Sequence, residues 1–93
     1  MRDIAITEKQ LGYMKHAIGY ERKAVKRGKY NAYRNRFITN DLDGNWQKLV
    51  ENGFAEGAPF NGGGGDNPRI YWVTEKGYTL LERILEVKIV REV

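Results

Sequence analysis

The sequence contains no cysteine and only one histidine, His16. Without cysteine the chain can form neither a disulfide bond nor a thiolate metal site. Metal binding and acid–base catalysis usually draw on several histidines or paired carboxylates, and His16 stands without a metal partner or a nucleophile. We therefore expect no metal, no cofactor and no catalytic residue. This composition predicts a binding module and not an enzyme.

Long apolar runs are also lacking. No stretch reaches the roughly 18 apolar residues of a membrane span, and residues 1–6 are too short and too polar for a secretory signal. We expect a soluble, cytoplasmic protein with no membrane partner. Its 93 residues suit one domain, 1–93.

Proline is scarce, and Pro59 and Pro68 flank the one low-complexity segment, four consecutive glycines at 62–65. Residues 57–69 are therefore predicted to form a loop. Residues 54–56 alternate and residues 70–73 are β-branched and aromatic, so each is predicted to be a strand. Together they predict a hairpin with a flexible tip. The glycines are not a phosphate loop, because no Gly-Lys-Ser/Thr follows them.

Capping signals predict the first and third helices. Thr7 and Gln10 have the spacing of a capping box, which predicts a helix over about 7–18. Asp41 or Asp43 can cap a helix that ends at Asn52-Gly53. Leu42, Trp46, Leu49 and Val50 form the core-facing stripe of that helix.

The second and last helices have different signals. Tyr30, Tyr33 and Phe37 lie three to four residues apart, which predicts a short helix over about 31–38. Thr74 is predicted to cap the last helix. Residues 86–93 fit either an extension of that helix or a separate strand.

Positive charge is concentrated in the first part of the chain. Residues 1–40 carry a net charge of +7, whereas residues 41–93 carry −3. Seven cations and no acid occur within 22–36, a segment that could be a helix or a loop: Arg22, Lys23, Lys26, Arg27, Lys29, Arg34 and Arg36. Such a run favours phosphate contacts. The alternatives are an acidic protein surface or a solvated face with no partner.

The predicted order of three helices, a hairpin and a final helix is the plan of a winged helix-turn-helix domain. Residues 46–54 and 71–81 resemble the end of the recognition helix and the wing exit of MarR- and PadR-type regulators. The resemblance implies an α+β winged helix with three N-terminal helices, a two-stranded wing hairpin and a C-terminal helix. It also implies binding to duplex DNA as a transcriptional regulator. Because MarR-like proteins pair through their terminal helices, the resemblance further implies a homodimer with an apolar seam in the C-terminal helix and tail: Leu80, Leu85, Ile89, Val90 and Val93.

A second resemblance covers two short segments, residues 16–19 and residues 33–37. They are similar to segments of short proteins encoded by bacteriophages and prophages. This resemblance indicates an origin and implies no activity.

In a winged helix the third helix enters the major groove, and here it would present Asn45, Gln47 and Lys48. Residues 41–52 nevertheless carry a net charge of −2, and the wing has only Arg69 as a cation. The predicted nucleic-acid contacts are Arg22, Lys23, Lys26, Arg27, Lys29, Arg34, Arg36, Asn45, Gln47, Lys48 and Arg69. The alternative is an interaction module that binds and modulates a host protein.

Overall fold

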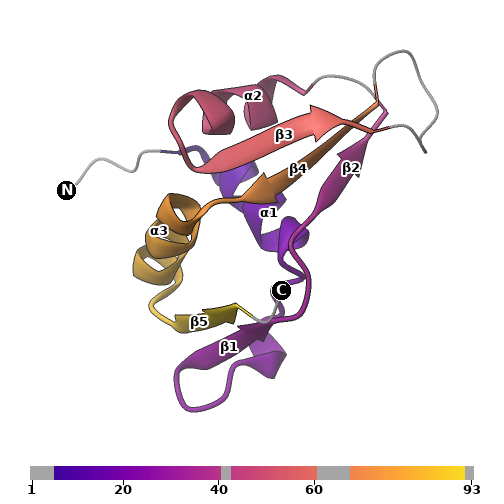
Figure 1. Ribbon diagram of the computed structural model, residues 1–93. Helices are drawn as coiled ribbons and strands as arrows, with labels where there is room; N and C mark the ends of the chain where they lie inside the picture. Colours follow the sequence, from indigo (N-terminus) through magenta and orange to yellow (C-terminus); the bar gives the residue numbers. More distant parts are fainter. Residues whose placement is uncertain (1–5, 41–42, 61–67, 92–93) are drawn as a thin grey trace.

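The computed structural model describes residues 6–40, 43–60 and 68–91. These residues form an α+β fold in which the strands make two separate sheets (Figure 1). In chain order the elements are α1 (Glu8–Ala17), the 3-10 helix η1 (Arg22–Ala24), β1 (Lys29–Ala32), β2 (Phe37–Thr39), α2 (Gly44–Glu51), β3 (Ala55–Pro59), β4 (Arg69–Val73), α3 (Glu75–Leu85) and β5 (Lys88–Arg91). No helix among the described residues is long and apolar enough to cross a membrane.

The predicted winged helix with three N-terminal helices is wrong. Strands β1 and β2 occupy the segment 31–38 where the second helix was predicted, so within the described residues only α1, α2 and the short η1 precede the β3–β4 hairpin. The aromatic spacing fitted a helix, but burial along β1 alternates: Tyr30 and Ala32 are buried, whereas Lys29 and Asn31 are exposed. Alternating burial is the signature of a strand with one face on the core.

The predicted helix caps are confirmed. The Gln10 backbone N–H donates to Thr7 Oγ1 (3.1 Å), and the Thr7 backbone N–H donates to Gln10 Oε1 (3.0 Å), which completes the capping box. Asp43 Oδ1 accepts from the backbone of α2, and Thr74 Oγ1 accepts from the Gly77 N–H (3.2 Å). These bonds satisfy backbone donors that have no partner inside the helix.

The hairpin strands are longer than predicted. The β3–β4 register runs from Ala55↔Val73 to Pro59↔Arg69, so the predicted loop 57–69 is too long at both ends. The glycines 62–65 lie outside the described residues. Strand β2 pairs with the other edge of β4, giving the antiparallel order β2-β4-β3.

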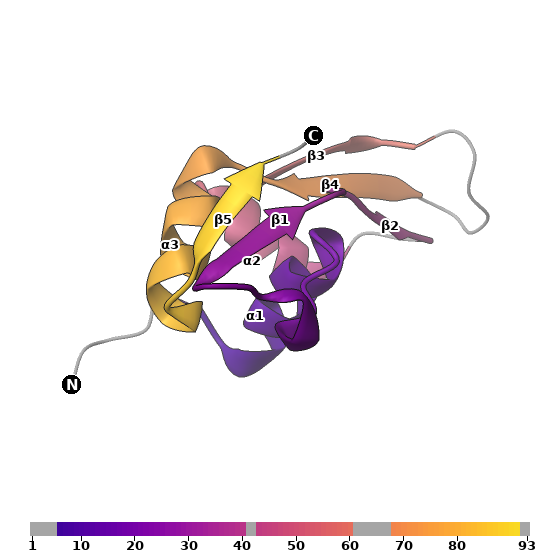
Figure 2. The same cartoon turned by 90° about the horizontal axis from the view of Figure 1, so that it is seen from below.

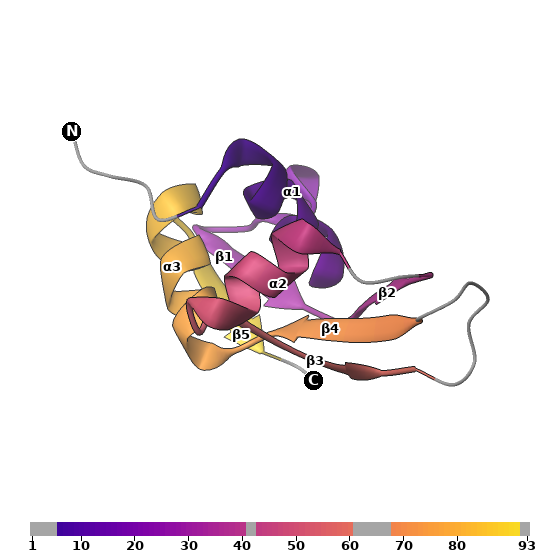
Figure 3. The same ribbon diagram turned by 90° about the horizontal axis from the view of Figure 1, so that it is seen from above.

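An aromatic stack fills the space between the helices and the three-stranded sheet. Trp46 of α2 is fully buried, and its ring is stacked on Tyr71 of β4 at 5.2 Å between centroids. Figure 3 shows α2 lying over this sheet beside α1. Trp72 is only half-buried, because alternation along β4 turns it away from Tyr71, and its Nε1 donates to Glu56 (3.2 Å).

The C-terminal tail forms a strand, which decides the alternative left open by the sequence. Helix α3 ends because Glu86 adopts a left-handed conformation with φ of 58°. The chain then turns back as β5, which pairs in parallel with β1 (Figure 2). Ile89 is buried in the core of its own chain, so it is not available for the predicted dimer seam. The homodimer itself remains a prediction.

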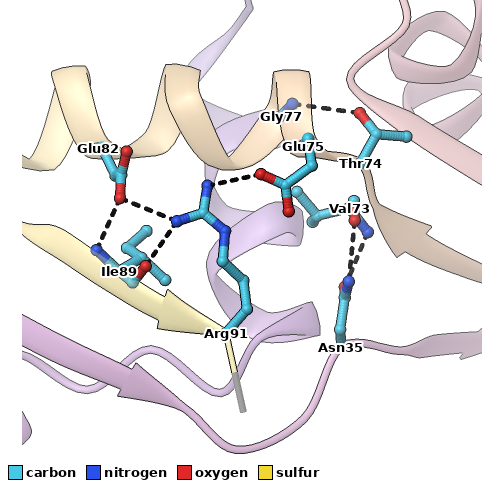
Figure 4. Close-up of polar contacts among 8 residues, drawn as sticks. All are labelled: Asn35, Val73, Thr74, Glu75, Gly77, Glu82, Ile89 and Arg91. Carbon is cyan, nitrogen blue, oxygen red and sulfur yellow. Dashed lines mark hydrogen bonds and ion pairs between the residues drawn. The ribbon is translucent and has the colours of Figure 1, made fainter. Parts of the chain in front are cut away.

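Polar side chains on α3 fasten β5 in place (Figure 4). Glu82 Oε2 accepts from the Ile89 N–H (2.9 Å) and from Arg91 Nη1 (3.1 Å). Arg91 also reaches Glu75 (3.2 Å), and its guanidinium lies 4.5 Å from the ring centroid of Tyr78. The backbone hydrogen bond from Ile89, followed by the charge of Arg91, lowers the pKa of Glu82 against an opposing effect of partial burial.

Candidate nucleic-acid interface

Five of the predicted cations lie together in one exposed segment, residues 22–29, which we call the basic turn. Lys26 and Lys29 exchange two backbone hydrogen bonds of 2.8 and 3.0 Å. Arg27 and Gly28 between them have φ of 54° and 75°, as in a two-residue type I′ turn. The cations of the basic turn, Arg22, Lys23, Lys26, Arg27 and Lys29, are all exposed.

The tip of this turn carries an unfavourable residue. Asparagine, aspartate and glycine are the residues preferred at positive φ in type I′ turns, because other side chains crowd the backbone there. Arg27 occupies that position with φ of 54°. The conformation costs about 1 kcal/mol relative to an unstrained residue.

A sixth cation joins the turn from the far end of the chain. Lys88 of β5 is the register partner of Lys29 of β1, and its N–H donates to the Gly28 carbonyl (2.8 Å). Both lysines are exposed and lie on the same face of the parallel pair, where like charges oppose each other. We call the six residues Arg22, Lys23, Lys26, Arg27, Lys29 and Lys88 the basic surface.

The charges of the basic surface are not neutralised within the described parts of the chain. The ion pairs there join Lys48 to Glu51 and Arg91 to Glu75 and Glu82, and none includes a residue of the basic surface. Glu21 precedes the basic turn and Glu86 precedes β5, so two carboxylates flank the surface without pairing with it.

Tyr30 ties the basic turn to the core. Its ring is buried and its hydroxyl donates to the Ile18 carbonyl (3.2 Å) and to the Gly19 carbonyl at the end of α1. Burial raises the pKa of Tyr30 above its ordinary value. Tyr20 packs edge-on against it at 5.1 Å. The cations therefore project from a segment whose base is held in place.

The last two cations of the segment 22–36, Arg34 and Arg36, lie in the connection between β1 and β2. Arg34 Nη2 donates to the His16 carbonyl (2.7 Å), and the Arg36 N–H donates to the Ala17 carbonyl (3.0 Å). Between them, the Asn35 amide bonds both the N–H and the carbonyl of Val73 (2.8 and 2.9 Å; Figure 4). This connection is irregular in conformation but firmly anchored.

Two hollows adjoin these residues. A small pocket of about 110 Å³ is lined by His16, Arg34, Arg36, Phe37 and Ile38. An open groove of about 670 Å³ lies beside the basic turn, and its lining is Lys15, Tyr20, Arg22, Val25, Gly28, Ile84, Leu85, Glu86 and Val87. The pocket is cationic, whereas the groove combines an apolar floor with two cations and one acid.

The remaining predicted contacts lie apart from the basic surface. Figure 1 shows α2 and the β1–β5 pair on opposite sides of the molecule. Asn45 accepts from Gln10 (3.5 Å), Gln47 donates to the Tyr71 hydroxyl (2.6 Å), and Lys48 lies 3.9 Å from Glu51. Arg69 lies over the Tyr71 ring at the start of β4. Asn45 and Gln47, which were predicted to read bases, thus each use one side-chain atom for a contact within the fold.

Lys15 and Lys88 were missed by the sequence reasoning. Lys15 lies on the last turn of α1, 5.6 Å from the Tyr20 ring centroid, and lines the groove. Its position in the capped helix could have placed it near Tyr20. Lys88 carried no local signal, because only the parallel pairing with β1 brings it to Lys29.

Comparisons with protein-family models, with curated proteins and with solved structures find no match to this chain. The resemblances to MarR- and PadR-type regulators and to short phage proteins therefore remain predictions. The function proposed below rests on the residues of the chain itself.

Proposed function

We propose that this protein binds nucleic acid through phosphate contacts made by its basic surface. One observation carries the proposal: the parallel pairing of β1 with β5 adds Lys88 to the basic turn, giving six exposed cations without a carboxylate partner among the described residues. Clustered lysines and arginines bind the phosphate backbone and release its counterions.

Two features of this surface cost stability. Arg27 is held at positive φ, and Lys29 lies directly beside Lys88. Among the described residues, neither side chain forms a hydrogen bond or an ion pair that would offset this cost. Local conflicts of this kind are expected where a residue is kept for binding. A polyanion on this face would relieve the repulsion between the lysines.

The proposed binding is largely independent of base sequence. Asn45 and Gln47 make contacts within the fold, and Lys48 is near Glu51, so α2 does not offer a free set of base-reading groups. Contacts from lysine and arginine to phosphates position a nucleic acid but do not read its sequence.

The test is fluorescence anisotropy with labelled oligonucleotides of random sequence, single-stranded and duplex, across a salt series. The variant Arg22→Ala/Lys23→Ala/Lys26→Ala removes three charges of the basic surface. We expect it to weaken binding at least tenfold at low salt and to flatten the dependence of log K on log salt by about two to three units.

The matched control is Lys9→Ala/Lys48→Ala/Arg83→Ala, which removes the same charge from exposed positions on three helices. It should retain most of the affinity. Equal losses in the two triple variants would mean that overall charge alone governs binding, and absence of binding at low salt would refute the proposal.

The groove favours a second candidate, a module that binds another protein. Val25, Ile84, Leu85 and Val87 provide an apolar floor, while Lys15 and Arg22 provide cationic edges. An acidic segment with apolar anchors fits this pattern. Parallel pull-downs from nuclease-treated lysate with wild type and with the Ile84→Asp/Val87→Asp variant test this candidate. Recovery of the same partner by wild type and by the variant would contradict a role for the groove.

A further inference from the structure

We propose that the nucleic acid is single-stranded and that one of its bases stacks on Tyr33. This inference rests on the proposed function and names the class of nucleic acid and the residue that receives it. It arises from the anchored connection between β1 and β2, which the phosphate contacts of the basic surface do not involve.

Tyr33 is the most exposed large hydrophobic residue among those described, with 59% of its surface accessible. Its ring lies against Gly19, where a Cβ atom would come within 2.7 Å of the ring. Gly19, with φ of 69°, ends α1, so the ring rests on a fixed backbone support. The exposed part of the ring is available as a stacking platform for a base.

One cation lies close to this platform, because the Arg34 guanidinium is 5.6 Å from the Tyr33 ring centroid. Arg36, two residues further along the chain, is exposed. Both line the small pocket with His16. Arg34 Nε is buried and has no hydrogen-bond partner among the described residues. A phosphate at this pocket of about 110 Å³ would meet two guanidinium groups.

The anchoring bonds prepare the platform before any ligand arrives. Arg34 is bonded to the His16 carbonyl, Asn35 to Val73 and Arg36 to the Ala17 carbonyl. A connection without regular structure would otherwise lose considerable conformational entropy on binding. Here most of that ordering is already achieved by the fold.

These features fit a single strand better than a duplex. Bases of a single strand are free to stack on aromatic side chains, whereas those of a duplex are stacked on one another. A sequence-specific duplex reader would need an element that enters a groove with free polar groups. Asn45 and Gln47 of α2 each use one side-chain atom for a contact within the fold, and α2 lies away from the β1–β5 pair (Figure 1).

The experiment compares Tyr33→Ala with Tyr33→Phe, using labelled oligo(dT) and a duplex of the same length and salt concentration. We expect wild type to prefer the single strand. Tyr33→Ala should weaken single-strand binding by about 5- to 100-fold and leave duplex binding unchanged. Tyr33→Phe, which keeps the ring, should bind as wild type does. Thermal unfolding of each variant verifies that the fold is intact.

A direct readout is the proton spectrum of the Tyr33 ring. Stacking of a thymine should shift its resonances upfield on addition of oligo(dT), and the duplex should not. Failure of this inference differs from failure of the proposed function. Stronger binding to the duplex, or unchanged single-strand affinity of Tyr33→Ala, overturns the stacking role even if the basic-surface variant still loses affinity. If wild type binds neither the single strand nor the duplex at low salt, both the stacking role and the proposed function are overturned.

Discussion

The two sheets of this protein are stabilised in different ways. The β2-β4-β3 sheet is antiparallel, and its central strand packs Tyr71 against the fully buried Trp46. The β1–β5 sheet is a parallel pair with Tyr30, Ala32 and Ile89 on its buried face. It depends in addition on side-chain bonds from α3 and on the Tyr30 hydroxyl.

The difference shows how a small domain can present clustered charge. A two-stranded sheet is marginal by itself, and parallel pairs are slightly less stable than antiparallel ones. In this protein the fully buried Trp46 packs on the antiparallel sheet, whereas the basic surface lies on the parallel pair. Mutations should therefore separate into those that unfold the protein and those that change the charged face.

The largest effect should come from the aromatic core. Trp46→Ala should lower the free energy of unfolding by about 3–5 kcal/mol, because a fully buried indole leaves a cavity between Tyr71 and Tyr13. Trp72→Ala, at a half-buried position on the opposite sheet face, should cost less, about 1–2 kcal/mol. Urea unfolding followed by circular dichroism gives both values, and Trp46→Phe provides a graded variant. Equal losses would contradict a core centred on Trp46.

A smaller effect should follow from loosening β5. Glu82→Gln removes the charge that holds Arg91 and should cost about 1–2 kcal/mol at pH 7. Glu75→Gln is the matched control, because Glu75 is an exposed partner of the same arginine and should cost no more than about 0.5 kcal/mol. Amide exchange within β5 should accelerate only in Glu82→Gln. Similar losses in both variants would show that Glu82 is not the main fastening.

This contribution depends on pH with a definite sign. Since the folded-state pKa of Glu82 is below its ordinary value of 4.5, its stabilisation is fully present above pH 4.5 and is lost as the pH falls through the folded-state pKa. Urea unfolding of wild type and Glu82→Gln between pH 7 and pH 3 should therefore converge at the acid end. A stability difference that stays constant down to pH 3 would contradict this assignment.

The tip of the basic turn should show a gain in stability together with a loss of binding. Arg27→Asn should stabilise the protein by about 0.5–1 kcal/mol by relieving the positive φ, and it should weaken nucleic-acid binding by removing a cation. Glu86→Asn is a close control, because Glu86 also has positive φ but is an acid. It should stabilise the protein without weakening binding. Unfolding measurements give the stability of both variants, and anisotropy measurements give their affinity for nucleic acid.

The smallest effect concerns the lysine pair. Lys29→Glu should replace repulsion of Lys88 by attraction and raise stability by about 0.2–0.5 kcal/mol, while lowering affinity for nucleic acid. The gain should disappear in a Lys88→Ala background, which a double-mutant cycle measures. A gain of the same size in that background would mean that the two side chains do not interact.

Parts of the fold could be predicted because their signals are local. The capping box of Thr7 and Gln10 and the cap at Asp43 each involve residues within three positions of one another, and the structure contains both. The hairpin strands were indicated by the composition of each short segment, although their paired residues lie 10 or more positions apart. The segment 31–38 could not be predicted in the same way. Tyr30, Tyr33 and Phe37 fit a helical spacing as well as a strand and an irregular connection.

The same reasoning applies to the candidate interface. The run of cations from Arg22 to Lys29 was visible in the sequence, but its conformation as a 3-10 helix and a type I′ turn was not. The exposure of Tyr33 was also not visible. An aromatic residue is expected in the core by default, and here the anchoring of its neighbours turns it outward.

By itself, the sequence determined where α1 and α3 begin, limited the cap of α2 to Asp41 or Asp43, and showed that the N-terminal part is strongly basic. Caps and charge can be predicted in this way because they depend on neighbouring residues. The tertiary structure alone decided that residues 29–32 are a strand and that Lys88 lies beside Lys29. A parallel strand pair requires a long connection between its members, so its partners lie far apart in the chain and leave no periodic signal that joins them.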